Sequence, residues 1–363
     1  MRARTLLAAA VAVTMLGVGC KPQSAADTST LDDTAALQAQ FDALTPGSTL
    51  TLEPRVYHHS GILTIRTSAV TIDGNGSTLV ATDDATSAVN VLANNVSLNN
   101  MTLGANLIGP RYYGIQQHKL VIGGNNDSVS NVTINGSAGA GVYVNGAGWF
   151  NLSGITVNSS RADGIHMTNG SHDGIVTDSV TTNTGDDGFA VVSYIPDGKI
   201  CNNITVNNPV VNGTTWGRGI SVVGGQNITY NNIKVSNTNA AGVYVAAEPS
   251  YNTRGVNGVT VNGGTVTGAS SNPDHEHGAI LVYAGNPGQT IDNVTIENLS
   301  ISGTGSAAER EIGLILENGG STSNVNFTDL NIEKSSLPTL YTNAPESGYA
   351  MRRVLVGGVP AQN

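Results

Sequence analysis

The hydrophobic positions of this chain fall in short runs that alternate with polar residues, and most of these runs begin directly after a glycine. Alternation over a few residues is typical of short β-strands, and helical periodicity is nearly absent. Successive glycines of this kind lie 27, 23, 24, 31, 23, 36 and 35 residues apart. A period near 23 residues with variable insertions predicts a solenoid whose loops lengthen at one corner. The repeating pairs are Gly114-Ile115, Gly141-Val142, Gly164-Ile165, Gly188-Phe189, Gly219-Ile220, Gly242-Val243, Gly278-Ala279 and Gly313-Leu314.

A second apolar position repeats in phase with the first, because Ile134, Val157 and Val235 each lie seven residues before a glycine. Asparagine-rich stretches such as Asn131–Ile134 and Asn203–Val206 link the runs. Inward β-branched residues and corner asparagines describe a right-handed parallel β-helix. The Asn-x-Ser/Thr triplets also match glycosylation sites, but the repeat by itself accounts for them. We therefore predict an all-β, single-domain solenoid over residues 27–363.

One segment near the N-terminus departs from the strand pattern. Leu37, Phe41 and Leu44 lie at helical spacing, which predicts a short helix within residues 31–44. This segment, together with Val70–Gly74 further on, resembles the first coils of pectate-lyase-superfamily β-helices. In those proteins a short amphipathic helix caps the open end of the solenoid core. The resemblance implies the same cap here, covering an apolar edge that would otherwise face water.

The composition narrows the functional classes. The chain has 363 residues and a net charge of 16 − 26 = −10, which argues against a nucleic-acid partner. Only 12% of the residues are charged and 45 are glycine, so disorder of the highly charged kind is disfavoured. Two cysteines cannot form a disulfide framework. No cofactor is predicted, and we expect a monomer.

The N-terminal residues 1–20 have the pattern of a secretory signal. Arg2 and Arg4 precede an apolar run from Leu6 to Val18, which is too short for a comfortable membrane span. Cys20 follows small residues, as in bacterial lipoproteins, where it would become the lipidated first residue. The alternative is ordinary cleavage after Ala26. Either way we expect an exported protein, secreted or held at the cell surface, that meets a membrane only through this lipid anchor.

The side chains before the successive glycines should stack as a ladder, because neighbouring strands lie about 4.8 Å apart. Two adjacent rungs are carboxylates, Asp186 lies beside the second, and the next rung is a guanidinium. Two residues beyond each glycine, alternation turns His166, Ala190, Ser221 and Tyr244 to the outer side of the same face. The ladder runs Tyr113, Ala140, Asp163, Asp187, Arg218, Ala241, His277 and Ile312.

This ladder predicts acid/base chemistry. Stacked carboxylates about 5 Å apart repel one another, so one keeps its proton to a higher pH than the other. A protonated and an ionised carboxyl side by side is what acid/base cleavage of a glycosidic bond requires. The alternative is turn chemistry, with aspartate at a corner and glycine at positive φ. Two Asp-Gly pairs in successive coils, with Asp186 and Arg218 beside them, favour a functional site.

The carboxylates belong to motifs that resemble a known active site. The segments Arg161–Ile165, Gly185–Val191 and Gly217–Val222 are similar, in that order, to the successive active-site coils of the polygalacturonases, glycoside hydrolase family 28. That family has Asn-Thr-Asp-Gly, Asp-Asp, Gly-His-Gly and finally Arg-Ile-Lys. The resemblance implies that Asp163, Asp186 and Asp187 are the catalytic carboxylates of an inverting hydrolase. By spacing alone, a separation of about 5 Å would favour retention.

Two departures from the family bear on the substrate. Arg218 stands where the family has a histidine, and Tyr244-Val245-Ala246 stands where Arg-Ile-Lys would follow. The missing Arg and Lys would have held a substrate carboxylate, so we expect a neutral or weakly charged glycan rather than plain galacturonan. In the working mechanism Asp187 protonates the glycosidic oxygen, and Asp163, helped by Asp186, deprotonates the attacking water.

Several further residues are candidates for contact with the substrate. Arg218 would hold a catalytic carboxylate ionised or bind a sugar hydroxyl, and Tyr244 would stack on a sugar ring. His275-Glu276-His277 could suggest a metal, but no third and fourth ligand are identifiable, so none is predicted. The predicted substrate-binding residues are His166, Arg218, Tyr244, Trp216, Glu248 and His277.

Two other functions remain open on the same scaffold. One is a polysaccharide lyase or C5-epimerase in which Arg218 acts as the base, although the pKa of an arginine exceeds 12. The other is a non-catalytic surface solenoid that binds glycan. This second hypothesis predicts that loss of Asp186 and Asp187 leaves the function of the protein intact.

Overall fold

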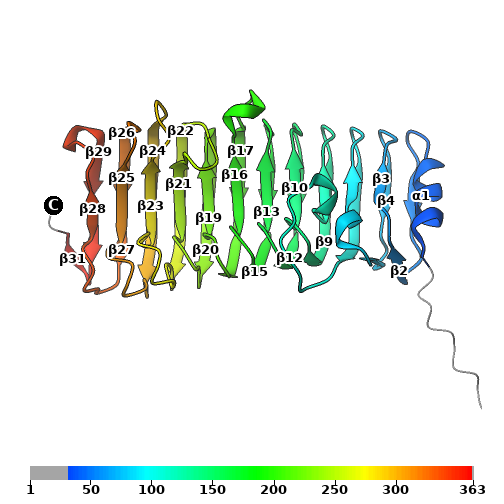
Figure 1. Cartoon of the computed structure of the whole chain (residues 1–363), viewed down its shortest axis with the longest axis horizontal. Helices are drawn as coiled ribbons and strands as arrows, with labels where there is room; N and C mark the ends of the chain where they lie inside the picture. The colour runs from blue at the N-terminus through cyan, green and yellow to red at the C-terminus, as the bar shows by residue number, and fades with distance from the viewer. Residues whose placement is uncertain (1–31, 362–363) are drawn as a thin grey trace, which may run out of the picture. The chain divides into compact units, whose positions relative to one another are not determined.

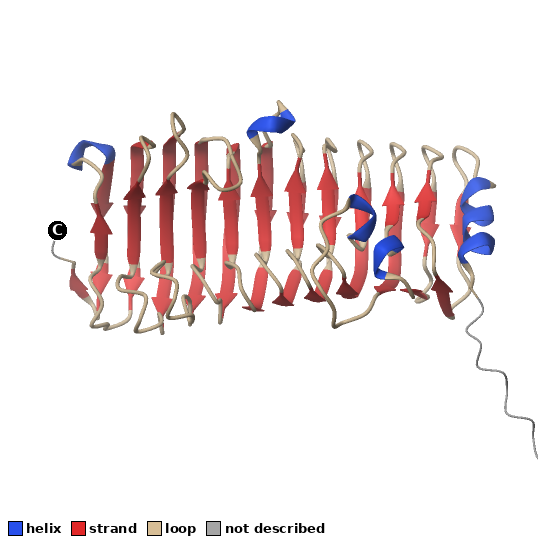
Figure 2. Ribbon diagram, in the orientation of Figure 1, coloured by secondary structure: helices blue, strands red, loops and turns tan. Residues whose placement is uncertain are grey.

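The computed structural model describes residues 32–361, and these form a parallel β-helix. Successive coils stack along one axis, with the single α-helix at the N-terminal end (Figures 1 and 2). The predicted all-β solenoid is thus confirmed. The signal segment 1–20, the lipidation site Cys20 and the proposed domain start at residue 27 lie outside the described residues. Within the described part, no helix is both long and apolar enough to cross a membrane.

One face of the solenoid is a parallel sheet to which each coil contributes one strand, and we call it the front sheet. Each strand between the two ends of the sheet pairs with the strands of the preceding and following coils. Among the described residues its strands, in chain order, are β3 (Leu63–Ile65), β6 (Val89–Val91), β8 (Leu120–Ile122), β10 (Val142–Asn145), β13 (Ile165–Thr168), β16 (Phe189–Val192), β19 (Ile220–Val223), β21 (Val243–Ala247), β23 (Ile280–Ala284), β25 (Ile312–Leu316) and β28 (Leu340–Thr342).

The remaining strands form a second sheet, the back sheet, which bends around the rest of each coil. Its pairing is parallel except for the last pair, β30 with β31. In the described residues its strands are β1 (Thr49–Thr51), β2 (Val56–His59), β4 (Thr71–Asp73), β5 (Thr78–Ala81), β7 (Ser97–Gly104), β9 (Ser128–Ser137), β11 (Asn151–Ser153), β12 (Thr156–Ser160), β14 (Ile175–Thr177), β15 (Val180–Thr184), β17 (Asn202–Asn207), β18 (Val210–Thr214), β20 (Gly225–Ser236), β22 (Val256–Thr267), β24 (Thr290–Ser302), β26 (Ser321–Thr328), β27 (Asn331–Ile332), β29 (Tyr349–Arg352), β30 (Leu355–Val356) and β31 (Val359–Pro360).

Asparagines make the corners of the back sheet, as their repeat predicts. Asn208 and Asn232 adopt left-handed backbone conformations, each with φ of 53°. Asn208 Nδ2 donates to Asp178 Oδ1 at 2.8 Å, and Asn232 Nδ2 donates to Asn208 Oδ1 at 2.8 Å. Asparagine tolerates this conformation better than other non-glycine residues. Its amide then continues a hydrogen-bonded ladder from coil to coil, so these residues have a structural role.

Helix α1 (Thr34–Asp42) closes the N-terminal end of the core, as predicted. Leu37 and Phe41 are buried among the interior side chains, and Leu44 packs at their edge. The Gln38 side chain also satisfies the open edge of β3: its Oε1 accepts from Thr64 N at 2.8 Å and its Nε2 donates to Thr64 O at 2.9 Å. The short 3-10 helices are η1 (Asp84–Thr86), η2 (Ile115–Gln117), η3 (Ile195–Asp197) and η4 (Glu346–Gly348).

The glycines that precede the front-sheet strands are required by the tight stacking of coils. None of Gly164, Gly188 and Gly219 has a positive φ, so their Asp-Gly and Arg-Gly pairs are not the turn chemistry of the alternative interpretation. A Cβ on Gly188 would lie 2.7 Å from the Gly219 carbonyl oxygen of the next coil. A Cβ on Gly164 would lie 2.5 Å from the Gly188 carbonyl oxygen. Only glycine allows the coils to approach this closely.

We expect Gly188→Ala to lower the free energy of unfolding by about 1–3 kcal/mol, because the added methyl group overpacks a rigid backbone contact. The matched control is Gly104→Ala, whose Cβ would lie 3.4 Å from a Val80 methyl group, an ordinary contact. Urea unfolding of the two variants measures the difference. Equal stability of both would contradict this explanation of the glycine repeat.

The register of the glycine ladder is confirmed at its centre and wrong at both ends. Strand pairing aligns Ile165, Phe189, Ile220 and Val243, each directly after its glycine. Beyond these coils, Val142 pairs with Leu120, Val243 with Ile280 and Ile280 with Ile312. The rungs predicted for Tyr113, His277 and Ile312 therefore belong to His118, Gly278 and Arg310. In these coils a long insertion precedes the strand, and the glycine used for the predicted register does not lie directly before the first residue of the strand.

Candidate active site

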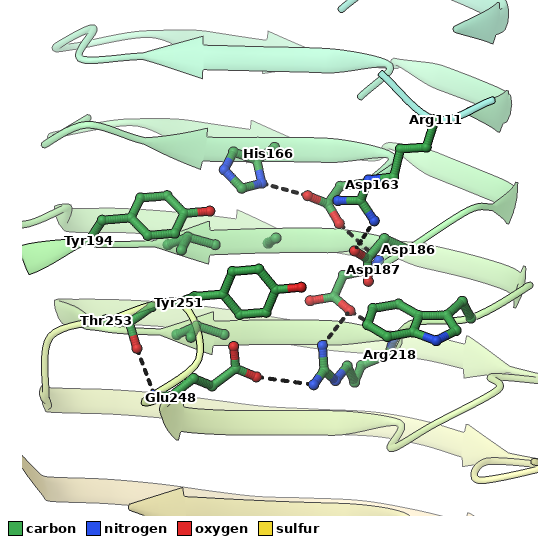
Figure 3. Close-up of a pocket in the computed structure, with 14 residues that line it drawn as sticks. Arg111, Asp163, His166, Asp186, Asp187, Tyr194, Arg218, Glu248, Tyr251 and Thr253 are labelled. Carbon is green, nitrogen blue, oxygen red and sulfur yellow. Dashed lines mark hydrogen bonds and ion pairs between the residues drawn. The ribbon is translucent and has the colours of Figure 1, made fainter. Parts of the chain in front are cut away.

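Three aspartates meet at the edge of the front sheet where its strands begin. Asp163 lies two residues before β13, and Asp186 and Asp187 lie just before β16 in the next coil. All three are buried, and one oxygen from each lies within 4.8 Å of the others (Figure 3). The stacking of coils thus produces the carboxylate cluster that the motifs predict.

Asp163 is held in its ionised form. Its Oδ2 lies 2.5 Å from His166 Nδ1, and its Oδ1 accepts a hydrogen bond from Asp187 N at 2.9 Å. Burial by itself would raise the pKa of Asp163. The hydrogen bond and charge of His166, with the charge of Arg111, outweigh burial and leave the pKa below the ordinary value. Asp163 is therefore suited to accept a proton.

Asp187 has the opposite tendency. Burial raises its pKa well above the ordinary value; the charge of Arg218 offsets part of this rise, and repulsion from Asp186 and Asp163 adds to it. Its Oδ1 accepts from Arg218 N at 2.8 Å, and its Oδ2 accepts from Ser221 Oγ at 2.5 Å. These donors fix the carboxyl group in one orientation.

Asp186 is the third member of the cluster, and a distant residue contacts it. Arg111 Nη1 lies 2.5 Å from Asp186 Oδ2, while the buried Oδ1 has no hydrogen-bond partner. Burial and the neighbouring charge of Asp163 raise the pKa of Asp186, against the lowering effect of Arg111. The Asp186–Asp187 pair therefore retains a proton at a pH where Asp163 is ionised. Two guanidinium groups already compensate the negative charge of this cluster.

Arg218 connects the cluster to Glu248 and Tyr244. Its Nη1 lies 3.7 Å from Asp187 Oδ1, and its Nη2 donates to Glu248 Oε1 at 3.1 Å. Tyr244 Oη donates to the same Glu248 oxygen at 2.8 Å. Glu248 is buried rather than a solvated loop residue. The guanidinium is thus held between two carboxylates and is not free to bind a third.

Tyr244 does not have the predicted role in stacking on a sugar. It is 3% exposed, and the Arg218 guanidinium lies over its ring, 4.3 Å from the centroid. The His277 ring stacks parallel to it at 5.9 Å. Tyr244 therefore acts on the cavity only through Arg218 and Glu248. His277 packs behind Tyr244 and does not line the cavity, which corrects its predicted contact with the substrate.

The cluster opens into a small cavity of about 70 Å³. Trp216 lines it as predicted, together with Tyr194, Tyr251 and Thr253 from two connections that pack on one another. These connections are joined where Ile195 N donates to Asn252 O at 2.9 Å. They form one wall of the cavity beside the front sheet (Figure 3).

Arg111 is the functional candidate that the sequence did not reveal. It lies in the connection of residues 105–114, between β7 and η2, which we call the strap. Arg161 holds the strap: its guanidinium donates to Asp84 and to the carbonyl oxygens of Asn106 and Ile108, at 2.7 and 3.0 Å. Arg111 carries no motif, and its contact with Asp186 spans 75 residues. The polygalacturonase motif has Asn where this chain has Arg161, the residue that holds the strap. This replacement was the one signal in the sequence that pointed toward the strap.

The metal alternative finds no support in the His275–His277 segment. The two histidine rings lie 5.2 Å apart and Glu276 pairs with Arg310. Among the described residues, only the three aspartates bring together enough ligand atoms to hold an ion, and both Arg111 and Arg218 already pair with them.

The opposed pKa shifts predict a bell-shaped dependence of turnover on pH. Activity is lost as pH falls through the lowered pKa of Asp163, and as pH rises through the raised pKa values of the pair. In Arg111→Gln the loss of a positive charge raises both, so both limbs move to higher pH. Initial rates across buffered pH values measure this. Unmoved limbs in this variant would contradict the assignment.

The comparisons with known proteins concern the fold. No family model and no curated protein matches the sequence. The catalytic domain of a GH87 α-1,3-glucanase in complex with tetrasaccharides has a TM-score of 0.69 and 17% identity, over 86% of this chain and 60% of that one. The catalytic unit of a thermostable GH87 α-1,3-glucanase from Streptomyces thermodiastaticus strain HF3-3 has a TM-score of 0.58 and 18% identity, over 90% of this chain and 65% of that one.

A polygalacturonase from Erwinia carotovora ssp. carotovora has a TM-score of 0.62 and 17% identity, over 90% of this chain and 94% of that one. The chain therefore spans nearly all of the polygalacturonase and about 60% of the first α-1,3-glucanase domain. These likenesses confirm the right-handed parallel β-helix of the pectate-lyase type. Membership of glycoside hydrolase family 28 stays a prediction.

Proposed function

We propose that this protein is a glycoside hydrolase that cleaves a neutral polysaccharide. The observation that carries the proposal is the buried cluster in which Asp163 has a lowered pKa and Asp186 and Asp187 have raised ones. Pairs of carboxyls with pKa values pushed apart are the acid and base of glycosidic bond cleavage. The structurally similar proteins named above are α-1,3-glucanases and a polygalacturonase, which are glycoside hydrolases and support the same reaction class.

The proposed reaction adds one water molecule across one glycosidic bond. Ionised Asp163 takes a proton from the water as the water oxygen attacks the anomeric carbon. The Asp186–Asp187 pair gives its proton to the glycosidic oxygen as that bond breaks. His166 holds Asp163 in place, and Ser221 and the Arg218 backbone N–H hold Asp187. The charge that develops is thus met by groups already in position.

We further propose that the reaction inverts the anomeric configuration, as the resemblance to polygalacturonases implies. One oxygen from each carboxyl group lies within 4.8 Å of the others. A spacing this short would by itself favour retention, so the proposal of inversion rests on the resemblance. Inversion requires room for a water molecule between base and sugar. The configuration of the first-formed reducing end, followed by NMR, tests this point.

The charges of the cavity support a neutral substrate. Arg218 is paired with Asp187 and Glu248, and Arg111 with Asp186, so the positive charge of each guanidinium is already compensated by a carboxylate of the protein. Arg218 cannot act as a lyase base either. Burial alone would lower its pKa, but the charge of Asp187 and of its other neighbours raises it above the ordinary value, so it keeps its proton. These contacts favour hydrolysis over the lyase and epimerase alternatives.

Export and lipidation at Cys20 remain proposals that rest on the N-terminal sequence. A monomeric state is a separate proposal. Mass spectrometry of the mature N-terminus, isolated from the producing cells, tests processing and lipidation together.

The function is tested with a panel of neutral and acidic polysaccharides. New reducing ends and the ultraviolet absorbance of unsaturated sugars are followed in parallel. We expect reducing ends without absorbance on a neutral glycan, and none on polygalacturonate. Absorbance together with reducing ends would show a lyase, and binding without cleavage would show a glycan-binding solenoid.

A further inference from the structure

A second hollow adjoins the cavity of the aspartates. It measures about 760 Å³, within the usual range of ligand sites, whereas the catalytic cavity measures about 70 Å³. The two share Arg111, Trp216 and Tyr251 as lining residues. We call the larger hollow the lateral groove, because it runs from the cluster between the strap and Trp216 toward the back sheet at Ser159 and Asn183.

The lining of the lateral groove is aromatic and neutral polar. Among the described residues five aromatic side chains are strongly exposed, and three of them line this groove: Tyr113 at 80%, Trp216 at 46% and Tyr251 at 56%. Ser159, Asn183 and Thr215 add hydroxyl and amide groups. Exposed aromatic rings beside a few convergent polar groups are the mark of a binding surface, and sugars present an apolar ring face edged by hydroxyls.

The charges of the groove are already satisfied. Arg161 pairs with Asp84 and with carbonyl oxygens of the strap, and Arg111 pairs with Asp186. The described lining contains no carboxylate side chain. A uronate or a phosphate would meet only guanidinium groups that are already paired with carboxylates, whereas a neutral sugar chain needs no cation.

One wall of the groove is rigid before any ligand binds. Tyr113 lies on the strap, and Arg161 joins the strap to the coil that carries Asp163. A Cβ on Gly109 would lie 2.6 Å from Arg161 Nη1, so a larger residue at this position would force the guanidinium to shift. A wall fixed in this way lowers the ordering cost of binding.

We propose that the lateral groove is a binding site for a segment of neutral glycan that leads to the catalytic aspartates, with Tyr113 and Trp216 as its sugar-stacking walls. This proposal extends the proposed function. It rests on that function for the statement that the bound glycan leads to the catalytic aspartates. If the groove binds part of the glycan, the affinity of the protein for a glycan increases with the length of the glycan.

The experiment measures binding separately from cleavage. The full-length protein with Asp187→Asn, which prevents turnover, is run by affinity electrophoresis in gels containing dextran, laminarin, soluble starch, galactomannan or polygalacturonate. Tyr113→Ala and Trp216→Ala are added singly. The matched control is Tyr341→Ala, which removes an exposed tyrosine that does not line the groove.

We expect a neutral glycan to retard the protein, and each groove variant to weaken binding about tenfold, the equivalent of losing one well-stacked ring. Tyr341→Ala should bind as the parent does. Three results would contradict the proposed site. These are retardation by polygalacturonate alone, retardation by none of the glycans, and equal retardation of Tyr113→Ala and the parent. If binding depends on Tyr113 but the wild-type protein cleaves no glycan, the glycan-binding site is supported and the proposed hydrolase activity is contradicted.

Discussion

Asp187→Asn should lower turnover by about 10²–10⁴-fold, the usual contribution of a positioned acid or base. Asparagine keeps the size of the side chain and still accepts the Arg218 backbone hydrogen bond, but it cannot hold or release the shared proton. Reducing-end formation on the cleaved polysaccharide measures the loss. The thermal unfolding midpoint should stay close to that of the wild type or rise, because burial already disfavours the charge of this group.

Asp274→Asn is the control for this substitution, since it removes an exposed carboxylate next to His275, whose ring lies 6.3 Å from that of Trp216. It should leave turnover unchanged. Undiminished turnover in Asp187→Asn would remove Asp187 from the chemistry, and an equal loss in both variants would point to a general effect of charge.

The second large effect is expected from Arg161→Met, which should lower the free energy of unfolding by about 3–5 kcal/mol, the usual cost of breaking a buried ion pair. The substitution removes the charged partner of Asp84, which keeps only the Asn106 amide as a donor, and it leaves the carbonyl oxygens of Asn106 and Ile108 without the guanidinium. It also frees the strap, so Arg111 loses its fixed position on Asp186 and turnover falls as well.

Urea unfolding and initial rates are measured together, with Arg66→Met, an exposed arginine, as control. Arg161→Lys separates charge from geometry, because a single ammonium cannot reach all the partners of the planar guanidinium. It should restore only part of the stability. Wild-type stability and turnover in Arg161→Met would refute the role of the strap.

The fold was predictable because every coil solves the same packing problem with the same residue types. Gly164, Gly188 and Gly219 mark places where a Cβ would collide with the next coil, so their spacing reports strand starts directly. Where insertions are long, a glycine such as Gly278 or Gly313 serves another purpose, and only hydrogen-bonded pairing fixes the register. Local sequence could not supply that information.

The same distinction applies to the site. Asp163 and Asp187 come together because they occupy the same ladder position in successive coils, and Asp186 and His166 lie within three residues of them in the chain. Arg111 reaches the cluster from a loop whose path depends on tertiary contacts, and its sequence environment does not encode that path. The burial of Tyr244 under Arg218 was equally invisible, because alternation gives the face of a strand but not what covers it.

The central claim, addition of water across a glycosidic bond by the aspartate cluster, is tested most directly by the masses of the products. Defined neutral oligosaccharides, an α-1,3-linked glucose tetrasaccharide among them, are incubated with the wild-type protein and analysed by mass spectrometry. The account predicts product pairs whose masses sum to that of the substrate plus one water. Products that sum to the substrate mass alone, one of them unsaturated, would contradict it.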